Sequence, residues 1–108
     1  DKTLLFTLAE STNLWEKRIA IIATWYFIRN NHFECTLKIA GNLLCDKHDL
    51  IHKAVGWMLR EVGKRNQAIL VEFLDSHACR MPRTMLRYAI ERLMPTTRKT
   101  YLLVKPIE

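Results

Sequence analysis

The chain has 108 residues, enough for one domain that can bury roughly two-thirds of its unfolded surface. An apolar content of 49% excludes a disordered chain, and three glycines with three prolines favour helices over a turn-rich β fold. The formal net charge of +6 predicts an anionic partner, without distinguishing a nucleic acid from a membrane surface.

The apolar spacing predicts helices throughout and no strand. Asn13 is expected to cap the second helix, with Glu16 in the capping-box position. Asn30 and Asn31 are expected to end it, because asparagine tolerates left-handed backbone geometry. The expected helices cover residues 3–10, 13–29, 33–45, 47–64, 66–77 and 81–94, with a last helical turn or two at 96–104.

The predicted helix at residues 47–64 has two opposed faces. At roughly 100° per residue, four of its residues fall within about 60° of each other: Lys53, Trp57, Arg60 and Lys64. The other side is aliphatic: Ile51, Val55, Met58, Leu59 and Val62. A tryptophan among cations suits a polyanion that also offers something to stack on. The alternative is a solvated charged face with Trp57 packed against a neighbouring helix.

A repeated pattern links this helix to two others. Arg18-Ile-Ala, Lys53-Ala-Val and Arg87-Tyr-Ala are spaced 35 and 34 residues apart. Residues 18, 22, 25 and 29 share the spacing of 53, 57, 60 and 64, and the same register matches Arg29 with Lys64 and Arg98. The pattern predicts an all-α fold, a right-handed α-α superhelix or solenoid of three HEAT-like helix pairs, with the cations aligned on its concave wall. The alternative is a chance alignment of amphipathic helices.

Other motifs carry weaker signals. His48 and His52 lie at i, i+4 around Asp49, as in H-E-x-x-H zinc sites, but His32 and His77 lack ligand spacing, so we expect no metal and no cofactor. There is no G-x-S-x-G motif and no glycine-rich phosphate loop.

Three further sets of residues carry expectations of their own. Arg83 and Arg87 flank Thr84 near a predicted helix start, where backbone N–H groups favour phosphate; a solvated surface is the alternative. Trp15 and Trp25 are expected in the core. Cys35, Cys45 and Cys79 form no C-x-x-C pair, as in reduced cytosolic proteins.

Residues 19–28 are too few to span a bilayer, and no signal peptide is evident. We expect a cytoplasmic location, bacterial and nucleoid-associated. The chain lacks an initiating Met, and we expect it to start inside a longer protein.

Three segments, residues 13–21, 47–64 and 81–91, together resemble the DNA alkylation repair family of AlkD-like DNA glycosylases. The most specific is Lys-Ala-Val-Gly-Trp-Met-Leu-Arg-Glu at 53–61. The resemblance implies a HEAT-like solenoid that holds duplex DNA on a basic concave surface and hydrolyses the glycosidic bond of N3- and N7-alkylated purines. It also implies that Trp57 is an active-site tryptophan and that Arg18 contacts the DNA backbone by the lesion.

The sequence departs from the family at one point. The family's catalytic aspartate lies in a Trp-x-x-x-Asp segment upstream of the matched region, and no Asp of this chain, including Asp46 and Asp49, matches that motif. The resemblance therefore implies that residues 1–108 form the C-terminal, DNA-binding half of an alkylpurine glycosylase, inactive alone, with alkylated duplex DNA and the N-terminal half as partners. The expected DNA-binding residues are Arg18, Lys53, Trp57, Arg60, Lys64, Arg83 and Arg87. The alternatives are a non-enzymatic nucleic-acid-binding repeat module and a protein-binding HEAT scaffold.

Overall fold

The computed structural model describes residues 2–104, which are all-α and contain no strand. The helices are α1 (Lys2–Ala9), α2 (Leu14–Ala23), α3 (Trp25–Arg29), α4 (Glu34–Leu43), α5 (Asp49–Arg65), α6 (Gln67–His77), the 3₁₀ helix η1 (Ala78–Arg80), α7 (Arg83–Ile90) and α8 (Pro95–Leu102). The predicted fold class is confirmed.

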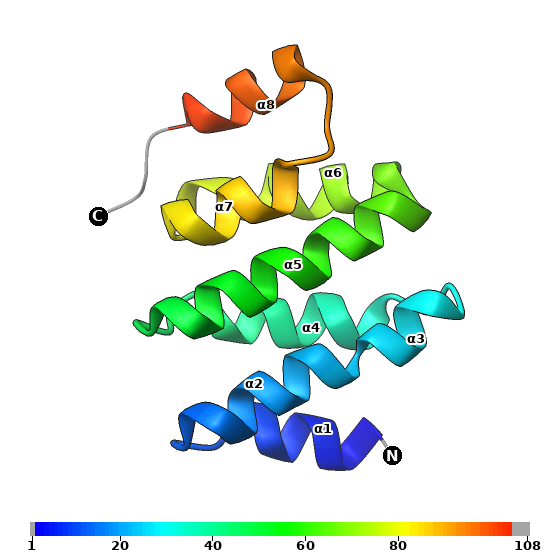
Figure 1. Ribbon diagram of the computed structural model, residues 1–108, viewed down its shortest axis with the longest axis vertical. Coiled ribbons are helices and arrows are strands. Elements are labelled where there is room, and N and C mark those ends of the chain that lie inside the picture. The colour runs from blue at the N-terminus through cyan, green and yellow to red at the C-terminus, as the bar shows by residue number, and fades with distance from the viewer. Residues whose placement is uncertain (1, 105–108) are drawn as a thin grey trace.

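The helices form two layers, with α2, α3, α5 and α7 in one and α1, α4 and α6 in the other (Figure 1). The smallest extent of the molecule, 19 Å, is that of two helices packed side by side, since each is about 10 Å wide. Between the layers, α1 packs against α2, and both α4 and α6 pack against α5, an arrangement that agrees with HEAT-like repeats. Helix α8 packs against α7 at the end of the stack.

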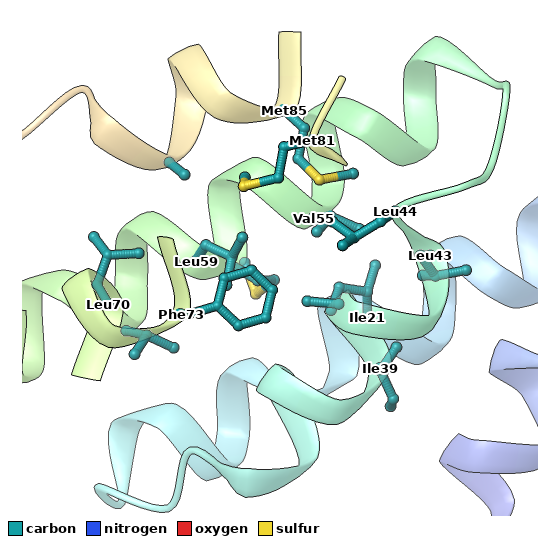
Figure 2. Close-up of a cluster of buried hydrophobic side chains, with 14 of the residues drawn as sticks. Ile21, Ile39, Leu43, Leu44, Val55, Leu59, Leu70, Phe73, Met81 and Met85 are labelled. Atoms are coloured by element: carbon teal, nitrogen blue, oxygen red, sulfur yellow. The ribbon is translucent and has the colours of Figure 1, made fainter. Parts of the chain in front are cut away.

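Helix α5 is the centre of this arrangement. Its most extensive contact is with α7, and it also packs against α2, α3, α4 and α6. The predicted aliphatic face is confirmed, because Ile51, Val55, Met58, Leu59 and Val62 are all fully buried. Figure 2 shows Val55 and Leu59 among side chains from α2, α4, α6 and α7. The core therefore lies between the layers and leaves the opposite stripe of α5 free for another role.

The helix ends follow the predicted capping chemistry with one change. The Asn13 side chain accepts hydrogen bonds from the backbone N–H of Trp15 at 2.8 Å and of Glu16 at 3.2 Å. The Glu16 carboxylate accepts from the Ser11 hydroxyl, and that hydroxyl accepts the Asn13 N–H at 2.9 Å. Ser11 thus takes the place that the capping box gives to Glu16. Asn31, with φ of 62°, provides the expected left-handed turn after α3.

Two helix boundaries differ from the prediction. The expected continuous helix at 13–29 is broken at the buried Thr24, whose hydroxyl donates to the carbonyl of Ile21 at 2.6 Å. Such a side-chain bond competes with the backbone ladder and bends a helix. The expected helix at 81–94 is shorter, because Pro82 precedes it and α7 ends at Ile90. Arg98 therefore lies on α8, so the repeat register that matches it with Lys64 fails.

Candidate nucleic-acid interface

The outer stripe of α5 carries the residues that the sequence singled out. Lys53 and Lys64 are exposed, and Trp57 and Arg60 are half-buried. The indole of Trp57 is thus not sealed in the aliphatic interior. With Trp25 and Arg29 of α3, these residues form a surface that we call the aromatic–cationic face, made of Trp25, Arg29, Lys53, Trp57, Arg60 and Lys64.

Two indoles meet at the boundary between α3 and α5. The ring centroids of Trp25 and Trp57 lie 5.9 Å apart, with the planes inclined by 53°. The guanidinium of Arg29 lies 5.4 Å from the centroid of the Trp25 ring, a cation–π contact. Trp25 is 39% exposed and Trp15 is 58% exposed, so the expectation that both belong to the core is wrong. The repeat pattern aligns Trp25 with Arg60, and this alignment was the signal in the sequence that Trp25 lies at the surface.

Carboxylates balance the cations of α5. Arg60 pairs with Glu91 at the end of α7 and lies 4.0 Å from the carboxylate of Glu61. The Lys64 ammonium lies 3.1 Å from the same Glu61. A phosphate that binds one of these cations must therefore share it with the carboxylate or displace that carboxylate.

Lys53 forms an ion pair within its own helix. Its ammonium lies 3.1 Å from the Asp49 carboxylate one turn earlier. The hydrogen bond to Asp49, with the charge of that carboxylate, raises the pKa of Lys53, so the amine remains charged at neutral pH. Lys53 is therefore positively charged at neutral pH, one turn before Trp57, with Asp49 as its partner.

Arg18 lies on α2 among apolar side chains. It is half-buried, and its Nε atom is buried without a hydrogen-bond partner among residues 2–104. It borders an open cavity of about 360 Å³ with Trp15, Ile19, Ile22 and Ala23. A guanidinium with a buried, unpaired N–H can still donate its outer N–H groups to an anion.

Arg83 and Arg87, one turn apart on α7, have different partners. The Arg83 guanidinium donates to the carbonyl of Val104 at 3.1 Å, which ties α7 to the segment that follows α8. Arg87 is exposed and borders a hollow with Arg98 and Lys99 of α8. Of the seven predicted site residues, the structure places Lys53, Trp57, Arg60 and Lys64 on one stripe and gives Arg83 a structural contact.

The histidine pair at the start of α5 has structural partners. His48 caps the helix, with Nδ1 accepting from the Leu50 N–H at 3.3 Å. His52 Nε2 lies in hydrogen-bond contact with the carbonyl of Asp46. Over residues 2–104, no group of three or more His, Cys, Asp or Glu could hold a metal ion. Within the same range, no helix is long and apolar enough to cross a membrane.

A family model described as DNA alkylation repair enzyme matches residues 1–93. The chain belongs to this family. The matched range contains Arg18, the whole aromatic–cationic face and α7, and ends before α8. Searches of curated proteins and of solved structures each found no match. Family membership implies a DNA substrate and agrees with the HEAT-like helix pairs.

Proposed function

We propose that this member of the DNA alkylation repair family is the DNA-binding half of an alkylpurine DNA glycosylase that acts in base-excision repair. The observation that supports this most is the pair of indoles, Trp25 and Trp57, at the surface between cations of α3 and α5. Cations suit backbone phosphates, and electron-rich rings suit a positively charged base or sugar.

The reaction needs little more than electrostatic help. A purine alkylated at N3 or N7 already carries positive charge, and so it departs as a neutral base when the glycosidic bond breaks. The sugar is left oxocarbenium-like, and water then adds at the same carbon and loses a proton. An indole face and a carboxylate stabilise that transient cation. Trp57 supplies the indole in this proposal, and Arg18 with Lys53, Arg60 and Lys64 holds the neighbouring phosphates.

The catalytic carboxylate is proposed to come from elsewhere in a longer protein, since no Asp here lies in a Trp-x-x-x-Asp segment. A further helical repeat on α2 would bring it close. Trp15, Ile19, Ala23 and Tyr26 form one exposed stripe of α2 and α3, with Trp15 58%, Ile19 57% and Tyr26 61% exposed. A terminal repeat normally presents a polar outer face, so this apolar stripe favours a stacked neighbour.

The test is Trp57→Ala in the longest form of the protein that contains this chain. We expect release of 7-methylguanine from duplex DNA under single-turnover conditions to fall by about 10²-fold, the loss typical of removing one transition-state contact. The affinity for undamaged duplex should change little, because the cations remain. Trp57→Phe is the matched control and should keep part of the activity through its ring. Unchanged excision by Trp57→Ala would exclude this role for the indole.

A further inference from the structure

A cationic cavity lies beyond the predicted site, where α5 ends, α6 begins and α7 ends. Its volume is about 500 Å³. Arg60, Lys64 and Arg92 border it together with the side chain of Gln67, over a floor of Gly63, Leu70, Ala89 and Leu93. The cavity thus brings together two cations of α5, one amide of α6 and the guanidinium of Arg92 from the turn after α7.

The three cations differ in their partners. Arg60 is held by Glu91 and Glu61, and Lys64 by Glu61. Arg92 is exposed and has no ion pair or hydrogen bond with any other residue from 2 to 104. An anion entering the hollow would meet one free guanidinium and two cations that carboxylates already position.

We propose that this cavity is a subsite for a backbone phosphate of duplex DNA, with Arg92 as a binding residue and Glu91 as an internal competitor for Arg60. The inference rests on the proposed function and extends it to residues outside the repeat register. Guanidinium groups bind phosphate through two parallel N–H···O bonds, and Gln67 can donate another from its amide. The Glu91 carboxylate occupies the Arg60 donors that a phosphate oxygen would otherwise take.

A phosphate on a polynucleotide fits this place better than a free one. Arg60 and Lys64 belong both to the cavity and to the outer stripe of α5 that carries Lys53 and Trp57. A strand that follows that stripe reaches the cavity without leaving cationic surface. The other phosphate contacts of the same strand then help to offset the free energy of displacing Glu91. A single inorganic phosphate has no such additional contacts.

The experiment compares Arg92→Gln with Arg65→Gln in residues 1–108. Arg65 is the matched control, because it is also exposed at the end of α5 but borders the hollow on the other side, with His32 and His77. Fluorescence anisotropy with an undamaged labelled duplex measures Kd at salt concentrations between about 50 and about 200 mM. Arg92→Gln should weaken binding about five- to tenfold and lower the salt slope by about one phosphate contact, whereas Arg65→Gln should change both much less.

The carboxylate competitor has its own pair of variants. Glu91→Gln should tighten binding about threefold, and more than Glu72→Gln, which removes the same charge from α6 away from this cavity. The gain should vanish in an Arg60→Gln background, because the competition is for that guanidinium. Equal effects of Glu91→Gln and Glu72→Gln would overturn the competitor role.

The outcomes separate this inference from the proposed function. Steep salt dependence with equal effects of Arg92→Gln and Arg65→Gln overturns the subsite and leaves the DNA-binding half intact. Absence of salt-dependent duplex binding in all variants overturns both. Calorimetry with inorganic phosphate tests whether the cavity binds a free phosphate rather than DNA. If phosphate binding requires Arg92 while the duplex affinity does not, the cavity is a site for free phosphate instead.

Discussion

Trp25 lies in an apolar stretch of sequence but at the surface of the folded protein. Its ring meets Trp57 from another helix and carries Arg29 on its outer side. Aromatic pairs and cation–π contacts of this kind each contribute on the order of 1 kcal/mol beyond simple burial. The pair therefore restricts the orientation of Trp57 before any ligand arrives, which suits the proposed role of this indole.

Tyr101 anchors α8 through one hydrogen bond. Its hydroxyl donates to the Asp75 carboxylate of α6 at 2.7 Å, and burial, with the nearby Asp75, raises the pKa of Tyr101 to about 12. Since the native pKa lies above the ordinary 10.0, the stabilisation is complete below pH 10 and is lost as the pH rises towards about 12.

We therefore expect Tyr101→Phe to lower the free energy of unfolding by about 1 kcal/mol at pH 7. Urea unfolding monitored by circular dichroism measures it, and the gap from the wild type should shrink above pH 10 as the wild type loses the bond. Tyr88→Phe is the control, since the hydroxyl of this tyrosine forms no hydrogen bond within residues 2–104. A gap that widens at high pH would contradict the proposed role of the bond.

At the scale of elements, the α5–α7 contact depends on the absence of one side chain. A Cβ on Gly56 would lie 2.5 Å from the Tyr88 Cβ and 2.6 Å from the Met85 carbonyl oxygen. Neither atom is the end of a flexible side chain, so α7 must move away. The glycine thus sets the distance between the two helices that carry Arg60 and its partner Glu91.

Gly56→Ala should destabilise the protein by about 1–3 kcal/mol through this overpacking, despite the better helix propensity of alanine. Gly41→Ala is the matched control: a Cβ there has no atom within 4 Å, and so stability should stay equal or rise slightly. Thermal unfolding of both variants decides the matter. Equal melting temperatures would show that α7 adjusts without cost.

The Lys17–Asp46 ion pair joins α2 to the turn between α4 and α5. The Lys17 ammonium lies 2.7 Å from the Asp46 carboxylate, which also accepts the His48 N–H at 2.9 Å. Partial burial alone would raise the pKa of Asp46, but these hydrogen bonds and the charges of Lys17 and His52 lower it below the ordinary 3.8. A lowered native pKa means that the pair stabilises the fold above that value and loses its effect in acid.

Asp46→Asn keeps an oxygen acceptor for His48 and removes only the charge. We expect a loss of about 1–2 kcal/mol near pH 7 that narrows as the pH falls below about 4, where the wild type itself becomes protonated. Chemical unfolding at both pH values measures it. Asp49→Asn, which removes an exposed partner of Lys53 instead, should cost clearly less. An equal cost for the two variants would show that burial of the pair does not matter.

For the whole molecule, the formal net charge is +6, which favours binding to a polyanion such as duplex DNA. If several phosphates are neutralised, the logarithm of the binding constant should fall steeply and linearly with the logarithm of salt concentration. A protein-binding scaffold of the same fold would show weak binding and a shallow slope. Titration of residues 1–108 with undamaged duplex at several salt concentrations distinguishes the two.

An excision assay distinguishes an enzyme from a non-enzymatic DNA-binding module. Residues 1–108 alone are expected to release almost no 7-methylguanine, because the proposed catalytic carboxylate lies outside them. Release at a rate near that of a complete glycosylase would contradict the proposed division of labour. Activity of a longer form that depends on Trp57 would exclude the non-enzymatic module.

The sequence alone determined the all-α class, the cap at Asn13 and the two faces of α5. These features depend on spacing along one helix and on local hydrogen bonds, which a linear sequence displays directly. The family resemblance at 13–21, 47–64 and 81–91 was visible for the same reason.

Only the tertiary structure decided which residues meet across helices. The contact of Trp25 with Trp57, the capture of Arg83 by Val104 and the pairing of Arg60 with Glu91 each join residues far apart in the chain. They depend on where α2 bends at Thr24, where α7 ends and how closely Gly56 lets α7 approach. Such contacts arise from the packing of whole helices, whose relative positions no periodicity within one helix can specify.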